Sequence, residues 1–308
     1  MNKVLIADSV SSAVSEVFDK NGIAYDTKIG LSEDELATEI TEYSGLIVRS
    51  AVTVTEKIIN SASNLKVIGR PGVGVDNVDL KAATNNGIVV MNTPLGNVQA
   101  TAELTFGIMH SLMRKISNAN QSMHQKKWEK KKFIGNEMYG KTIGIIGFGN
   151  IGKKVSQIAH AYGMNVLVYS ASISPEDEKK FNVTNQSIDD ILEGADIITF
   201  HNKLSENSKY LINSNAITKM KKNAIIINCA RGGLVNEKDI KEALENGNIA
   251  GYGCDVYENE PEQDSIFSSM DNVVMTPHIG ASTIEAQEKV AYQIAEQIVE
   301  FLKTLTPS

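Results

Sequence analysis

Three glycines follow the spacing G-x-G-x-x-G in Gly147-Phe148-Gly149-Asn150-Ile151-Gly152. An apolar segment, 142–146, precedes them, and a helical pattern, 153–162, follows. Between a strand and a helix, such glycines let the backbone turn tightly and approach a pyrophosphate, which the free N–H groups of the helix N-terminus stabilise. The motif predicts dinucleotide binding by Gly147, Gly149, Asn150, Ile151 and Gly152, and a glycine-rich turn without a ligand is the alternative.

The position after the next predicted strand, 165–169, commonly carries a carboxylate that accepts hydrogen bonds from the adenosine ribose. In this chain the position is Ser170, 18 residues past Gly152. The serine lacks the negative charge that would repel a 2′-phosphate, yet no arginine follows it to bind one. We therefore expect NAD as the cofactor and leave NADP open as a second one.

A cation, a carboxylate and an imidazole follow three further predicted strands. They are Arg231, Glu260 and His278. The carboxyl ends of parallel strands meet at one edge of an open α/β sheet, and ligands bind there. We therefore expect the three side chains to converge in one crevice with a catalytic geometry. A solvated surface charge is the alternative for each of them taken singly.

Short β-branched runs alternate with helical patterns almost throughout the chain, which is typical of βαβ units and parallel sheets. A helix is expected over 11–21, closed by Gly22, and a long helix over 99–116. A second βαβ series begins at Lys141, so the fold class is α/β with two doubly wound parallel-sheet domains. The expected strands are 4–7, 45–48, 65–69 and 87–91 in the first series, and 142–146, 165–169, 196–200, 224–228, 251–256 and 273–275 in the second.

The composition excludes several classes of protein. The chain has 308 residues, of which 42% are hydrophobic and 22% charged, and it has no apolar run of about 18 residues that could span a membrane. Its 30 basic and 37 acidic residues give a net charge of −7, which disfavours nucleic-acid binding. The cysteines at 229 and 254 lie in apolar segments, and the N-terminus lacks a signal-peptide pattern. We expect a cytoplasmic protein with reduced thiols and no metal.

The chain resembles the D-isomer-specific 2-hydroxyacid dehydrogenases over essentially its whole length, and within them the branch that acts on D-3-phosphoglycerate. Besides the glycine turn, the motifs that carry the resemblance are Arg49-Ser50-Ala51, Gly72-Val73-Gly74-Val75-Asp76-Asn77-Val78-Asp79, Met91-Asn92-Thr93-Pro94, Gly96-Asn97, Ala102-Glu103-Leu104, Lys127-Trp128-Glu129, Ala230-Arg231-Gly232-Gly233, Asp255-Val256-Tyr257, Glu260-Pro261 and Pro277-His278-Ile279-Gly280-Ala281-Ser282-Thr283.

The resemblance implies a role for each residue of the expected crevice. His278 would take the proton of the C2 hydroxyl as hydride leaves C2 for the nicotinamide. Glu260 would hold that imidazole and favour its charged form, and Arg231 would bind the substrate carboxylate and polarise the C2 oxygen. The other implied substrate contacts are Arg49, Ser50, Asn97 and the backbone of Val73 and Gly74. The other implied cofactor contacts are Val73, Ser170, His201, Asn202, Cys229, Ala230, Asp255 (at the nicotinamide carboxamide), Gly280 and Ala281.

The resemblance also implies an architecture. A Rossmann cofactor domain with a dimerisation arm, 98–283, would be inserted into a flavodoxin-like substrate domain made of 1–97 and 284–308, with substrate in the cleft between them. A homodimer is expected, formed by the arm around Trp128. Because the chain ends at Ser308, it would lack the regulatory serine-binding module of longer relatives, so free serine is not expected to inhibit.

The expected reaction is the NAD-dependent oxidation of D-3-phosphoglycerate to 3-phosphohydroxypyruvate, the first step of serine biosynthesis. The partner is then a small anionic 2-hydroxy acid. Two alternatives are open: a glyoxylate/hydroxypyruvate reductase or other D-2-hydroxyacid dehydrogenase, and a dinucleotide-sensing scaffold, because fold alone does not determine function.

Overall fold

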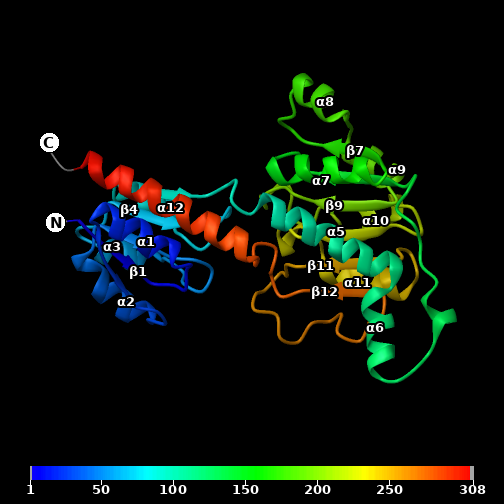
Figure 1. Cartoon of the computed structure of the whole chain (residues 1–308). Helices are drawn as coiled ribbons and strands as arrows, with labels where there is room; N and C mark the ends of the chain where they lie inside the picture. The colour runs from blue at the N-terminus through cyan, green and yellow to red at the C-terminus, as the bar shows by residue number, and fades with distance from the viewer. Residues whose placement is uncertain (1, 306–308) are drawn as a thin grey trace. The chain divides into compact units, whose positions relative to one another are not determined.

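A computed structural model describes residues 2–305 and divides the chain into two compact units (Figure 1). Unit 1 consists of Met1–Val98 and Ala281–Ser308, and unit 2 consists of Gln99–Gly280. The chain thus leaves the first unit, builds the second, and returns to the first with its last helix.

Unit 1 is built on a five-stranded parallel sheet in the order β2-β1-β3-β4-β5. The order reverses between β1 and β3, as in a flavodoxin-like doubly wound sheet, so the expected fold of this unit is confirmed. The strands are β1 (Lys3–Ile6), β2 (Ala24–Thr27), β3 (Gly45–Ile47), β4 (Val67–Arg70) and β5 (Val89–Asn92).

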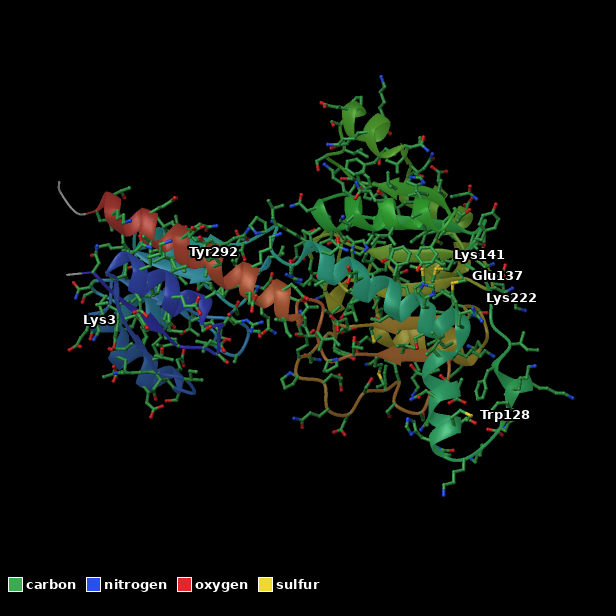
Figure 2. The ribbon with its side chains drawn as sticks, viewed as in Figure 1. Lys3, Trp128, Glu137, Lys141, Lys222 and Tyr292 are labelled. Carbon is green, nitrogen blue, oxygen red and sulfur yellow. The ribbon has the colours of Figure 1, made fainter. Side chains whose placement is uncertain are left out.

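Helices cover both faces of this sheet, because alternate residues of each strand point to opposite sides. Val4 and Ile6 pack against α1 (Ala13–Asn21) and α12 (Ile284–Thr304). Leu5 packs on the other side, in the core formed with α2, α3 and α4. Figure 2 marks Tyr292 on α12. The remaining helices of this unit are α2 (Glu33–Glu39), the short 3-10 helix η1 (Ile40–Glu42), α3 (Glu56–Ser61) and α4 (Leu80–Asn85).

Unit 2 is built on a seven-stranded parallel sheet in the order β12-β11-β10-β9-β6-β7-β8. Its first six strands along the chain follow the order 3-2-1-4-5-6 of a dinucleotide-binding sheet, which confirms the Rossmann prediction. The order reverses between β6 and β9. The strands are β6 (Thr142–Ile146), β7 (Asn165–Tyr169), β8 (Thr184–Asn185), β9 (Ile197–Phe200), β10 (Ile225–Asn228), β11 (Gly251–Cys254) and β12 (Val273–Met275).

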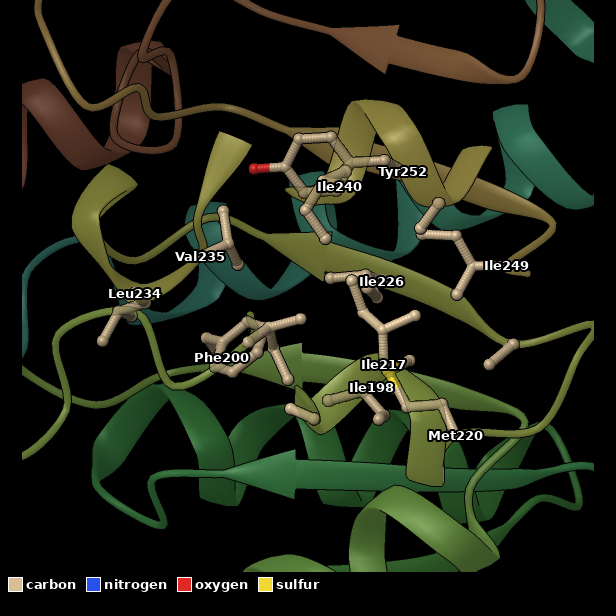
Figure 3. Close-up of a cluster of buried hydrophobic side chains, with 14 of the residues drawn as sticks. Ile198, Phe200, Ile217, Met220, Ile226, Leu234, Val235, Ile240, Ile249 and Tyr252 are labelled. Carbon is tan, nitrogen blue, oxygen red and sulfur yellow. The ribbon is translucent and has the colours of Figure 1, made fainter. Parts of the chain in front are cut away.

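Two hydrophobic cores cover the faces of the second sheet. Figure 3 shows part of one of them, in which Ile198, Phe200 and Ile226 from the strands meet Ile217 and Ile240 from α10 and α11. The other core packs α5 and α7 against the opposite face. The helices of unit 2 are α5 (Val98–Arg114), α6 (Ile116–His124), η2 (Lys130–Phe133), α7 (Asn150–Ala161), α8 (Pro175–Phe181), α9 (Ile188–Gly194), α10 (Ser214–Lys219), η3 (Gly232–Leu234) and α11 (Glu237–Glu245).

Three elements differ from the prediction. The expected helix over 99–116 ends at Arg114, because Lys115 adopts a left-handed backbone with φ 52°, and α6 starts beyond it. Ile116, the last residue of the expected helix, is 51% exposed. β2 and β8 were not predicted, because neither has a buried residue that would give an apolar run.

Among residues 2–305, no helix is both long and apolar enough to cross a membrane.

Candidate active site

The glycine turn joins β6 to α7 at the reversal point of the second sheet. Gly147 has φ 99°, and a Cβ there would lie 2.4 Å from the backbone nitrogen of Asn202. A Cβ on Gly152 would lie 2.1 Å from the carbonyl oxygen of Gly147. Both positions therefore need glycine for the packing of the protein itself.

Gly149 is different, because no atom lies within 4 Å of the place where its Cβ would be. It is the N-cap of α7 and has no side chain to cap the helix. The N–H groups of the first turn, on Asn150, Ile151 and Gly152, have no partner within a helix. The turn thus combines an open approach with the N–H groups of a helix N-terminus, which fits the pyrophosphate of a dinucleotide.

His201 and Asn202 follow β9, the strand next to β6, and so lie beside the glycine turn. His201 Nε2 lies 3.1 Å from Thr199 Oγ1. Within residues 2–305, His201 Nδ1 and Asn202 Oδ1 are buried without a hydrogen-bond partner. Burial lowers the pKa of His201 to about 3, so its ring is neutral near pH 7. Two orphaned polar atoms at this edge are consistent with a bound ligand that would satisfy them.

Ser170, directly after β7, is held through its backbone. Its N–H donates to Asn185 Oδ1 at 3.0 Å, and Asn185 Nδ2 donates to its carbonyl oxygen at 3.2 Å. The Ser170 hydroxyl accepts a long bond, 3.4 Å, from the N–H of Ser172. The position expected to read the ribose is therefore fixed in space and carries no charge of its own.

The His278 imidazole is paired with Glu260. Nδ1 lies 2.6 Å from Glu260 Oε2, and the backbone of His278 has φ 52°. Burial raises the pKa of Glu260, but the hydrogen bond to His278, the N–H of Tyr257 and the nearby Arg231 charge together bring it below its usual range. Glu260 is thus a carboxylate that holds one ring nitrogen, and it leaves Nε2 for a substrate.

Asp255 fixes the loop that carries His278. Its side chain is 1% exposed and accepts from the N–H groups of Ile279 at 2.7 Å and Gly280 at 2.8 Å. It also accepts from the Thr276 hydroxyl at 2.6 Å. Burial raises the pKa of Asp255, and these bonds oppose the rise. The family resemblance implied a cofactor contact for this residue, and the structure adds bonds that fix the backbone beside the His278 imidazole.

Arg231 lies on the segment that packs against the Glu260 loop. A Cβ on Gly232 would lie 1.9 Å from the carbonyl carbon of Tyr257, so the two backbones are in contact. Arg231 Nη1 donates to the carbonyl of Ala230 at 2.6 Å. Asn228, at the end of β10 and fully buried, shapes this turn by accepting from the N–H of Ala230 at 3.1 Å and donating to the carbonyl of Arg231 at 2.9 Å.

Asn228 was missed by sequence reasoning. The available signal was a single polar residue at the end of a buried isoleucine run, 225–227.

Its neighbour Cys229 is buried, and burial raises the pKa of the thiol to about 12, which makes it unreactive. The carbonyl of Gly280 accepts from Thr101 Oγ1 at 3.1 Å. Unit 2 thus brings Arg231, Glu260 and His278 to one sheet edge together with the predicted cofactor residues 147, 149–152, 170, 201–202, 229–230, 255 and 280.

The residues expected to bind substrate lie mostly in unit 1. Arg49 and Ser50 follow β3, at the reversal point of the first sheet, where open α/β sheets bind ligands. Val73 and Gly74 follow β4, and the Val73 carbonyl accepts from Asn92 Nδ2 at 2.6 Å. Asn97 precedes α5, and in the described part of the chain its Oδ1 is buried without a partner. Ala281, an expected cofactor contact, also belongs to this unit.

Comparisons with known proteins identify the family of this chain. The D-isomer specific 2-hydroxyacid dehydrogenase NAD-binding domain family matches residues 106–280. D-3-phosphoglycerate dehydrogenase of Bacillus subtilis is 43% identical over 307 residues, 99% of this chain and 58% of that protein. The Synechocystis enzyme of the same name is 45% identical over 302 residues, 98% of this chain and 54% of that protein.

The chain therefore spans about half the length of the curated relatives that it matches. Among solved structures, the TT0316 protein of Thermus thermophilus has a TM-score of 0.90 and 30% identity, covering 98% of this chain and 97% of that one. The family match includes the glycine turn, Arg231, Glu260 and His278. The protein belongs to the D-isomer-specific 2-hydroxyacid dehydrogenase family.

Proposed function

We propose that this protein oxidises D-3-phosphoglycerate to 3-phosphohydroxypyruvate with NAD, as the first step of serine biosynthesis in the cytoplasm. The observation that carries the proposal is the 2.6 Å pair of His278 and Glu260, in the same unit as a dinucleotide-binding turn. Relatives named for this activity, 43–45% identical over nearly all of the chain, support the choice of substrate.

The chain's own residues account for the proton transfer. His278 Nε2 accepts the proton of the C2 hydroxyl, and Glu260 at Nδ1 stabilises the imidazolium that forms. Arg231 binds the substrate carboxylate through two parallel hydrogen bonds and polarises the C2 oxygen. Bound NAD supplies the acceptor for the hydride that leaves C2. The hydroxyl carbon becomes a ketone, so proton and hydride balance.

Substrate binding is assigned to residues of unit 1. We place Arg49, Ser50 and Asn97 around the substrate, with the backbone of Val73 and Gly74 at its carboxylate. Residues 1–97 and 284–308 are then the substrate domain, and 98–283 the NAD-binding domain. The cationic Arg49 is the residue that fits a 3-phosphate, since charge-assisted bonds to phosphate favour guanidinium.

A homodimer formed by the segment after α6 is part of the proposal. Trp128 is 81% exposed, Ile134 76% and Tyr139 79%, so this one segment presents three large apolar side chains that a partner subunit would cover. Figure 2 labels Trp128 on this segment. Sedimentation of the purified protein, with Trp128→Glu as the variant expected to dissociate, tests the dimer.

The test of the activity compares substrates that differ only in the phosphate. Initial rates with D-3-phosphoglycerate and D-glycerate should favour the phosphorylated substrate, and the preference should shrink as salt is added, because salt screens phosphate contacts. Equal efficiency for the two at low salt would contradict the proposal. Faster reduction of hydroxypyruvate or glyoxylate would then favour a reductase of the same family.

A further inference from the structure

The segment that carries Arg49 and Ser50 has no regular secondary structure, yet its backbone is held at four points. β3 ends at Ile47 and α3 begins at Glu56. Between them, the N–H of Arg49, the carbonyl of Arg49, the N–H of Ala51 and the carbonyl of Val52 each bond to a side chain from another part of unit 1. Two side chains, Asp8 and Asn77, make all four bonds.

Asp8 follows β1, the strand next to β3 at the reversal point of the sheet. Its Oδ2 accepts from the N–H of Arg49 at 2.9 Å and from that of Ala51 at 3.0 Å, and its Oδ1 accepts from the N–H of Ser9 at 2.7 Å. The side chain is only 6% exposed. A carboxylate is costly to bury and is retained only where several donors surround it. Here three backbone N–H groups do so.

The same corner also guides the Arg49 side chain. Arg49 Nη1 donates to the carbonyl of Ser9 at 3.4 Å. Ser9 is the residue whose N–H donates to Asp8, so Asp8 also holds a contact of the guanidinium. On the other side of the loop, Asn77 Nδ2 donates to the carbonyls of Arg49 at 2.5 Å and Val52 at 2.6 Å. The loop conformation, and with it the direction of Arg49, depends on these two clamps.

We propose that Asp8 is a positioning residue for substrate recognition: its carboxylate fixes the Arg49–Ala51 backbone and so presents the Arg49 guanidinium to the phosphate of the substrate. The negative charge of Asp8 would by itself disfavour an anionic ligand nearby. Its presence at this edge is explained by the three donors that it aligns and that a neutral side chain of this size could not satisfy together. This inference rests on the proposed function, because it concerns how that function recognises its substrate.

The test uses Asp8→Asn, which keeps the side-chain shape but replaces one acceptor oxygen by a donor. Displacing a recognition group by about 1 Å can cost on the order of 100-fold in rate. We therefore expect kcat/KM for D-3-phosphoglycerate to fall by about 10- to 100-fold, mainly through KM, while the value for D-glycerate changes less than about threefold. The matched control is Asp26→Asn, a carboxylate of the same sheet that accepts from the Tyr43 hydroxyl at 2.5 Å and pairs with Lys3 at 2.6 Å. It should leave the preference for phosphoglycerate unchanged.

A double-mutant cycle separates positioning from general support of the fold. If Asp8 acts through Arg49, adding Asp8→Asn to Arg49→Ala should lower kcat/KM for phosphoglycerate by less than about twofold further. If the double variant instead loses the product of the two single fold-losses in kcat/KM, the inference is wrong. If Asp8→Asn fails to fold, as judged by circular dichroism and melting temperature, Asp8→Glu, which keeps the carboxylate but lengthens the side chain by one carbon, replaces it in the same substrate comparison and the same cycle.

The outcomes also distinguish this inference from the proposed function. If the wild type prefers phosphoglycerate and Asp8→Asn keeps the full preference, the positioning role fails while the proposed function stands. If the wild type does not prefer phosphoglycerate over glycerate, the proposed function fails and takes the inference with it.

Discussion

Glu260 Oε2 lies 2.6 Å from His278 Nδ1, and the other oxygen of the same carboxylate accepts from the N–H of Tyr257 at 3.0 Å. The carboxylate is therefore anchored to its own loop while it orients the ring. This arrangement fixes which ring nitrogen is available for chemistry. It also makes His278 a group whose loss should affect the reaction much more than the fold, because the side chain is 49% exposed.

We predict that His278→Ala lowers kcat by about 10² to 10⁴, the range for removing a general base. The affinity for NAD and the melting temperature should stay close to those of the wild type, because the imidazole contributes little to the core. Steady-state rates, NAD titration by fluorescence and thermal melting measure the three quantities. Turnover at the wild-type rate would show that another group accepts the proton.

Arg231→Lys should lower kcat/KM by roughly 100-fold, because an ammonium cannot reproduce two parallel bonds to a carboxylate. NAD affinity should be unaffected. Arg114→Lys, an arginine at the end of α5, is the control that should behave like the wild type. If KM and kcat of Arg231→Lys both matched the wild type, the assigned role of the guanidinium would be wrong.

Alanine substitution at two glycines of the same turn should affect different properties, NAD binding in one case and stability in the other. Gly149→Ala meets no protein atom, so the fold should be unchanged, while the added methyl group weakens NAD binding by about tenfold or more because it intrudes on the pyrophosphate approach. Gly152→Ala places a carbon 2.1 Å from the Gly147 carbonyl and should destabilise the unit by about 1–3 kcal/mol. Thermal melting with NAD titration tests both. If Gly149→Ala binds NAD as tightly as the wild type does, the pyrophosphate does not bind at this turn.

Ser170→Asp should increase the preference for NAD over NADP by about tenfold, which corresponds to roughly 1.4 kcal/mol of charge repulsion. The substitution leaves the Asn185 bonds in place, because they hold only the backbone of residue 170. Ser170→Asn is the neutral control of similar shape. A ratio of NAD to NADP efficiency that is the same in all three proteins would mean that the ribose is recognised elsewhere.

His201 should make the protein less stable in mild acid. Burial lowers its pKa from 6.5 to about 3, so as the pH falls below 6.5 the unfolded chain binds a proton that the folded protein does not. Folding stability therefore falls through this window, by about 1 kcal/mol between pH 7 and pH 5.5.

For a unit of this size, that loss corresponds to a drop in melting temperature of roughly 2–4 °C. His201→Gln should not show this part of the pH dependence, whereas His124→Gln, at an exposed histidine, should retain it in full. Melting curves of the three proteins at both pH values provide the comparison. If the melting temperatures of the wild type and His201→Gln fall equally between the two pH values, a group other than His201 causes the loss.

The glycine turn and the placement of Arg231, Glu260 and His278 at one sheet edge could be predicted from sequence, because each depends on residue type at a strand end. The parallel sheets followed from alternating apolar runs and helical patterns. The break at Lys115 was missed, since a left-handed residue that is not glycine leaves no signal in a hydrophobic stripe. The edge strand β2 was missed as well, because it has no buried residue to mark it.

The sequence by itself thus determined the two sheets, the glycine turn and the strand ends that carry Arg231, Glu260 and His278, all of which arise from local backbone geometry and the polarity of short segments. The tertiary structure decided which side chains hold them in place. Asp255 bonds to Gly280, 25 residues away, and Asp8 bonds to Arg49, 41 residues away. Such pairings arise only when strands distant in the chain are laid side by side and their carboxyl ends meet, so that a buried carboxylate must find its donors in another loop.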